Sequence, residues 1–209
     1  METFKALDAI LEADTRNDLW HVGDPAAPDG HRPIRLAERY ESIVDLNLDA
    51  AVPENIRSAF NIARNLWVYG WFHYPFYTVA SFQAYVALEA ALQERWTTDP
   101  NASPKPPRGL RRLLSAAVER GWISDVGLRA KQDADRRRRE MRDSLPPPFS
   151  EIFAVEPDES DTQAYVRTVA DTLPDIRNSL AHGHSIHMPH HSQRVLVLVS
   201  GLLNQLFPG

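Results

Sequence analysis

The segment from Val79 to Trp96 constrains the fold more than any other part of the sequence. Its apolar residues fall on two adjoining rows at helical spacing, Val79-Phe82-Val86-Ala90 and Tyr85-Leu88-Leu92-Trp96. A helix on the surface of a globular protein needs only one such stripe to face the core. A stripe of double width indicates a helix with neighbours on several sides. We therefore expect this segment to be the central and most buried helix.

Helical spacing of apolar residues predicts several further helices. They begin or end at residues that favour helix termini, such as Pro53, Gly70 and Gly121. No segment alternates convincingly between apolar and polar residues as a strand does, although Val195 to Val199 has a strand-like composition. The predicted fold class is all-α, an antiparallel helical bundle with additional N-terminal helices and a C-terminal helix. The expected further helices are Glu2–Ala13, Pro53 to Gly70, Leu110 to Gly121, a charged helix through Arg136–Arg139, Asp161–Thr172, and Gln193–Phe207.

Proline and glycine mark the expected breaks between these helices. Residues 21 to 33 contain three prolines and two glycines and are predicted to form a loop. Pro174 is expected either to kink the helix before it or to begin a new one that carries Asp175 to Ala181. Gly183 is a candidate for the C-terminal cap of that region.

The composition excludes several classes of protein and site. The chain has no cysteine, so disulfides, thiolate zinc sites and cysteine nucleophiles are excluded. The first residues lack the basic region and the apolar stretch of a signal peptide. No segment approaches the roughly 20 apolar residues that a membrane-spanning helix needs. We therefore expect a cytoplasmic protein with no membrane partner, no metal and no other cofactor.

Charge is distributed unevenly along the chain. The net charge is −5, but residues 105 to 142 contain twelve Lys and Arg against five Asp and Glu. The last 34 residues contain no side-chain carboxylate, two arginines and five of the eight histidines. The net charge argues against a protein coated with nucleic acid, and the distribution places a basic segment on an acidic protein.

The segment from Arg177 to His182 contains side chains that can move a proton and stabilise the charge of a phosphoryl group. His182 lies four residues after Asn178, so on a helix the two share a face and the amide can orient the imidazole. A histidine can move protons near neutral pH, and a guanidinium can stabilise the charge of the crowded phosphorane. Arg177 lies about 140° around an ideal helix from His182, so one face does not hold both. A long side chain, a distorted helix end or a second copy must close that gap.

The segment Asp175-Ile176-Arg177-Asn178-Ser179-Leu180-Ala181-His182-Gly183 resembles the signature of the HEPN superfamily, in which an arginine, usually followed by a polar residue, precedes a histidine after four to six residues. The segments "YVALEAALQERW" and "GLRRLLSAAVERGWI" resemble the helices that precede this motif in many bacterial members. The resemblance implies a helical bundle that often forms a homodimer, in which two motifs meet in one metal-independent ribonuclease site.

With that resemblance, residues 53–209 are expected to form a HEPN-like domain and residues 1–52 an N-terminal helical extension and loop. Arg177, Asn178 and His182 are the expected catalytic residues. The implied function is an endoribonuclease acting as a toxin or phage-defence effector, with RNA as substrate and an antitoxin or regulatory protein as a further partner. The alternative is a non-catalytic HEPN-like module that binds a nucleotide, an RNA or a protein.

Other residues are candidates for supporting roles. His184 and His187 are expected to contact RNA phosphates from a loop, whereas a metal site that includes His190 and His191 is disfavoured because no carboxylate or cysteine accompanies these histidines. The run Arg136, Arg137, Arg138 and Arg139 either follows an RNA backbone or forms a solvated face paired with acids. The aromatic residues between Trp67 and Tyr77 favour core packing or a dimer interface over base stacking. Glu89, a charge among apolar rows, is a candidate ion-pair partner of Arg177.

Overall fold

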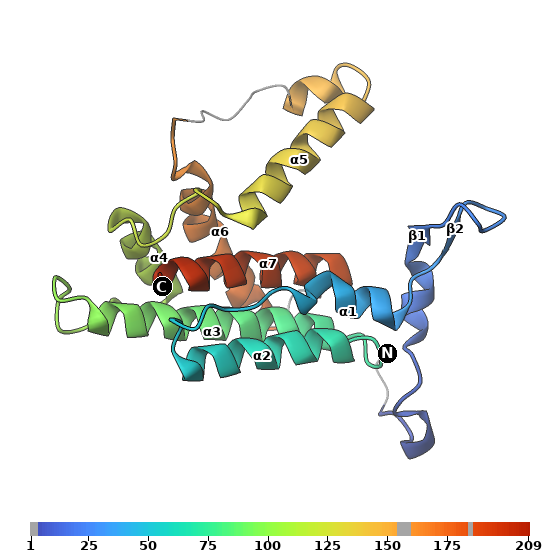
Figure 1. Cartoon of the computed structure of the whole chain (residues 1–209), viewed down its shortest axis with the longest axis horizontal. Coiled ribbons are helices and arrows are strands. Elements are labelled where there is room, and N and C mark those ends of the chain that lie inside the picture. Colours follow the sequence, from blue (N-terminus) through green and yellow to red (C-terminus); the bar gives the residue numbers. More distant parts are fainter. Residues whose placement is uncertain (1–3, 154–159, 184–185) are drawn as a thin grey trace.

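The computed structural model describes residues 4–153, 160–183 and 186–209 (Figure 1). These ranges are mostly helical, which confirms the all-α class, and their only sheet is a short two-stranded one. No helix within them is long and apolar enough to cross a membrane. In chain order the elements are η1 Leu7–Ala9, η2 Thr15–Leu19, β1 His21–Gly23, β2 His31–Pro33, α1 Leu36–Val44, α2 Glu54–Tyr69, α3 Phe76–Thr98, α4 Leu110–Glu119, α5 Arg129–Ser144, η3 Phe149–Phe153, α6 Ala164–Ala181 and α7 Pro189–Leu206, where η marks a 3₁₀ helix.

The central helix is α3, as the double apolar stripe predicts. It packs against α2, α4, α6 and α7. The row from Tyr85 to Trp96 is buried throughout, whereas Val79, at the start of the other row, is 43% exposed. A row of buried small residues, which the apolar pattern did not single out, completes the packed surface of α3: Ala80, Ala84, Ala87 and Ala91. Small side chains allow neighbouring helices to approach closely.

The helices around α3 do not all alternate in direction. The Ser192 hydroxyl of α7 donates to the Tyr77 carbonyl of α3 at 2.7 Å, and both residues lie in the first turns of their helices. The indole nitrogen of Trp67, near the end of α2, donates to the Pro189 carbonyl at the start of α7 at 3.2 Å. Thus α2 is antiparallel to α3 and α7, while α3 and α7 run in the same direction (Figure 1). The expected antiparallel arrangement therefore holds for only part of the bundle.

Helix α6 is continuous through Pro174, so no new helix begins there. Two contacts from other elements hold it. The buried Asp125 carboxylate accepts hydrogen bonds from the backbone N–H groups of Tyr165 and Val166, both at 2.9 Å, and so caps the start of the helix. Near the proline, the Arg111 guanidinium of α4 donates to the Asp171 carbonyl at 2.6 Å.

The N-terminal predictions were wrong in two places. The described residues of the expected helix Glu2–Ala13 contain only the 3₁₀ turn η1, and Phe4, Leu7 and Leu11 are exposed. Isolated helices of this length are marginal, and these side chains find no surface that buries them. The expected loop over residues 21 to 33 contains an antiparallel hairpin in which His21 pairs with Pro33 and Gly23 pairs with His31. These strands are too short to show alternation.

Other helices follow the sequence closely. Helix α2 buries Ile56, Phe60, Ala63 and Trp67, α4 ends two residues before Gly121, and α7 begins four residues earlier than expected. Side chains between α1 and α2, including Leu46 and Val52, are buried in the same core as α3. Helix α5 differs from the rest because only Ala130 is buried, and it leads away from the bundle (Figure 1).

Candidate functional site

The last turn of α6 carries Arg177, Asn178 and His182, and its position is set by packing on both sides of the motif. Leu173 and Leu180 are buried in the core. His182 follows the helix as its C-cap residue, and its backbone N–H donates to the Asn178 carbonyl at 3.1 Å. Gly183 then adopts a φ of 70°, which favours glycine, and its N–H donates to the Leu180 carbonyl. The predicted glycine cap is confirmed.

Arg177 is held against α3 by an ion pair. Its Nη2 donates to Glu89 Oε2 at 3.0 Å, which confirms the contact proposed from the sequence. The guanidinium also lies 5.6 Å from the centre of the Phe82 ring. The side chain is 29% exposed and that of Glu89 is 21% exposed. An arginine fixed by a carboxylate at a partly exposed position keeps N–H groups that can bind a phosphate.

Asn178 and His182 are both exposed. The side-chain carbonyl of Asn178 accepts a hydrogen bond from Arg177 Nη1 at 3.3 Å. That contact brings Asn178 to the arginine, while its expected role in orienting the His182 imidazole stays a prediction. Because His182 is the C-cap residue that follows α6, it lies at the end of the helix, while Arg177 reaches sideways to α3.

The histidines near the start of α7 differ in their surroundings. His184 lies outside the described residues. His187 is half-buried: its backbone N–H donates to Thr78 Oγ1 at 3.0 Å, and its Nδ1 lies 2.9 Å from Ser81 Oγ. Burial, and then the charge of His191, lower the pKa of His187 from its ordinary value. A contact of His187 with RNA remains a prediction, although its ring is directed to α3.

His190 and His191 lie in the first turn of α7, with ring centres 4.0 Å apart. Burial is the largest cause that lowers the pKa of His190, followed by the charge of His191. The Nδ1 of His190 is buried and has no hydrogen-bond partner within the described ranges. Among the residues that the structure describes, no three side chains of the ligating types are grouped closely enough to hold a metal ion.

The four consecutive arginines of α5 face different surroundings. Arg136 pairs with Asp133 at 2.7 Å. Arg138 Nε lies 3.4 Å from the Phe153 carbonyl, on the side of η3, and Arg139 is exposed. Arg137 and Arg136 border a cleft of about 730 Å³ between α5 and α7. The run therefore does not form one continuous stripe, which agrees with the rotation of 100° per residue on a helix.

The cleft between α5 and α7 also contains basic residues that the sequence did not mark as a site. Arg194 and His190 of α7 line it opposite Arg129, Arg136 and Arg137 of α5. The only sequence signal for Arg194 was its position as one of two arginines in a carboxylate-free C-terminal segment. Its approach to α5 depends on the tertiary arrangement.

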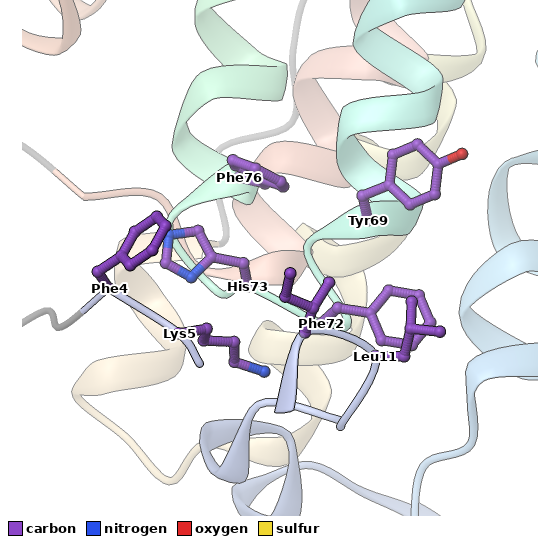
Figure 2. A pocket seen from close by; sticks show the side chains of 8 residues that line it. Phe4, Lys5, Leu11, Tyr69, Phe72, His73 and Phe76 are labelled. Carbon is purple, nitrogen blue, oxygen red and sulfur yellow. The ribbon is translucent and has the colours of Figure 1, made fainter. Parts of the chain in front are cut away.

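A second hollow, of about 700 Å³, is mostly apolar. It lies between the N-terminal segment and the corner that joins α2 to α3, where Phe4 and Lys5 meet His73 and Phe72 (Figure 2). The aromatic residues of this region divide by burial. Trp67 and Tyr77 are fully buried, which confirms core packing for them, whereas Tyr69 is 54% exposed at the edge of the hollow.

No family model, curated protein or solved structure matches the chain. The HEPN resemblance therefore rests on the residues of the sequence alone.

Proposed function

We propose that the protein is a HEPN-type, metal-independent endoribonuclease whose site is built from the ends of two α6 helices in a homodimer. The observation that carries this proposal is the placement of Arg177: Glu89 holds its guanidinium at a partly exposed position, on the same helix end that carries the exposed His182. A cation held in place and an exposed histidine at the same helix end are the two kinds of group that the reaction needs.

The proposed reaction uses the 2′-hydroxyl of the RNA as nucleophile. The 2′-oxygen attacks the adjacent phosphorus and the bond from phosphorus to the 5′-oxygen breaks, which leaves a 2′,3′-cyclic phosphate and a 5′-hydroxyl. One His182 takes the proton from the 2′-hydroxyl, and His182 of a second copy gives a proton to the departing 5′-oxygen. Arg177 stabilises the added negative charge of the phosphorane. Since one chain supplies one such histidine, the reaction favours a dimer.

Cleavage of labelled total RNA and tRNA in excess EDTA tests this function. We expect wild type to cleave, His182→Ala to lose about 10²- to 10⁴-fold in rate, and Arg177→Ala to lose about 10²-fold or more. Matched controls are His21→Ala, an exposed histidine of the hairpin, and Arg112→Ala, an exposed arginine of α4. Equal inactivity of wild type and all variants across several RNA classes would contradict the proposal and favour the non-catalytic binding module.

The dimer is tested by mixing. Wild type is mixed with an excess of inactive His182→Ala protein, and the activity per total protein is compared with the fraction of wild-type chains. If two chains share a site, the relative activity falls below that fraction, because mixed dimers are inactive. A proportional decrease would indicate that each chain acts alone.

Glu89→Gln tests how Arg177 is positioned. The amide removes the charge that holds the guanidinium but keeps the side-chain size, so we expect a lower turnover number and an altered dependence of cleavage on pH. Glu94→Gln, on the same helix beyond this contact, is the control. Unchanged activity of Glu89→Gln would show that Arg177 does not depend on this ion pair.

A biological role as a toxin or phage-defence effector, with an antitoxin or regulatory protein as partner, follows from the resemblance alone and belongs to the same proposal. Growth arrest on expression, relieved by His182→Ala, is the expected result.

A further inference from the structure

The cleft between α5 and α7 has a charge that its own side chains do not neutralise. Arginines approach it from both helices: Arg129, Arg136 and Arg137 from α5, and Arg194 from α7. Asp133 is the one carboxylate among the described residues that line it. Asp133 pairs with Arg136 at 2.7 Å and approaches Arg129 at 3.9 Å. It therefore offsets the charge of Arg129 and Arg136 and forms no ion pair with Arg137 or Arg194.

Arg137 and Arg194 are the two arginines of the cleft that Asp133 does not pair with. Neither forms an ion pair with a carboxylate in the described parts of the chain, and they approach closely enough for the charge of Arg137 to lower the pKa of Arg194, after the larger effect of burial. Two like charges facing each other across a cleft cost free energy in the empty protein, and an anion between them removes that cost. A guanidinium also matches the geometry of a phosphate by donating two parallel hydrogen bonds.

The floor of the cleft adjoins the motif helix. Ile176 of α6 and Tyr85 of α3 line it. Ile176 immediately precedes Arg177, and Tyr85 lies between Phe82 and Glu89, the two residues of α3 that contact Arg177. Helix α5 extends about 24 Å at 1.5 Å per residue. A strand that leaves the Arg177 region along α5 therefore meets arginines on both sides.

We propose that this cleft binds the sugar–phosphate backbone of single-stranded RNA, with Arg137 and Arg194 holding phosphates from opposite sides. The choice of RNA rests on the proposed function, while the charge of the cleft is independent of it. Only two of the four consecutive arginines of α5 would then contact the RNA: Arg136 and Arg137 line the cleft, whereas Arg138 and Arg139 do not. Asp133 limits the affinity because it competes with phosphate for Arg136.

The test measures binding of a short, fluorescein-labelled, 2′-O-methylated single-stranded RNA by anisotropy. This probe lacks the nucleophilic 2′-hydroxyl, so its binding is independent of cleavage. The double variant Arg137→Gln/Arg194→Gln is compared with Arg138→Gln/Arg139→Gln, which removes the same charge from the same protein. Thermal unfolding of each variant verifies its fold, and neither cleft arginine has an ion pair to lose among the described residues.

We expect the cleft double variant to lose roughly tenfold or more in affinity at low salt, and the control to stay within about threefold. The slope of log affinity against log salt should decrease by about 0.7 for each phosphate that the variant no longer neutralises. Asp133→Asn provides the opposite change, because freeing Arg136 should strengthen binding several-fold and steepen that slope. A rise in affinity of this size would support RNA binding in the cleft with a variant that keeps every arginine.

Three results would overturn the proposal. Equal losses in both double variants would mean that only the total charge matters. Competition by poly-glutamate as strong as by unlabelled RNA would assign the cleft to an acidic protein partner. Failure of wild type to bind the probe would exclude RNA from the cleft, and would leave the proposed nuclease to be judged separately by cleavage in EDTA.

Discussion

Helices α3 and α5 are both long, but they are stabilised by different kinds of interaction. Helix α3 buries ten residues from Tyr77 to Trp96, whereas α5 buries only Ala130. The surface of α5 is instead linked by pairs of opposite charge, such as Lys131 with Asp135 at 2.6 Å and Arg136 with Glu140 at 3.8 Å. Packing fixes α3 within the core, while short-range pairs stabilise α5 as a helix without fixing what it contacts.

This difference in packing bears on the role of each helix in the proposed function. Glu89 on α3 has a defined partner in Arg177, because the packing of α3 against α6 fixes the two side chains next to each other. The arginines of α5 keep free surface that faces α7 across a cleft. In the proposed function, the packed core positions Arg177, and the charged and weakly packed α5 holds an extended ligand.

The largest expected effect is the loss of packing on α3. Leu88 is fully buried, and Leu88→Ala should lower the free energy of unfolding by about 2–5 kcal/mol. Arg139→Ala on α5 is the contrast and should change it by less than about 0.5 kcal/mol, because its side chain is exposed. Urea unfolding followed by circular dichroism measures both. Similar losses would remove the distinction between the two helices.

A second expected effect concerns the segment that joins α4 to α5. Asp125 is 6% exposed and caps α6 through two backbone N–H groups, so Asp125→Asn should cost about 1–3 kcal/mol. Asp175→Asn removes an exposed pair with Arg111 and should cost less than about 1 kcal/mol. If Asp125→Asn were as mild as its control in thermal unfolding, the start of α6 would be held by something other than this cap.

Hydrogen exchange sharpens the comparison at the level of local stability. Amides in the second half of α5 should exchange faster than those in the middle of α3, because little apolar surface protects them. Raising the salt concentration should increase exchange in α5, since screening weakens its exposed charge pairs, and should leave α3 nearly unchanged. Equal protection of the two helices at both salt concentrations would show that α5 is held by packing.

The smallest expected effect is a dependence on pH at the junction of α3 and α7. Burial lowers the pKa of His187 and of His190 below the ordinary value of 6.5. Below that pH the unfolded chain binds protons that the folded chain does not, so the free energy of unfolding should fall as the pH decreases from 7.5 to about 5.5. His187→Gln should reduce this fall, whereas His21→Gln should not. An unchanged pH dependence in both variants would exclude His187 as a cause.

The candidate site was predictable where it depends on neighbouring residues in the chain, or on a charge that burial obliges to find a partner. The sequence predicted the helix that carries Arg177, the cap at Gly183 and the pairing of Arg177 with Glu89, because a charge within a buried apolar face needs a nearby partner. It did not predict Arg194 as a neighbour of Arg137, because neither residue lies on a predicted buried apolar face that would require a partner. The placement of His187 on Ser81 was missed for the same reason.

By itself, the sequence determined which segments from α2 onward are helical and which helix is central, because periodic burial of apolar side chains is a local property that repeats along each segment. It did not determine the hairpin at residues 21–33 or the exposure of Phe4 and Leu7, which depend on whether another surface is there to receive them. Only the tertiary structure decided that α7 runs parallel to α3 and that α5 leaves the bundle. Direction and neighbourhood arise from contacts between distant segments, and a helix of given periodicity satisfies many such arrangements equally well.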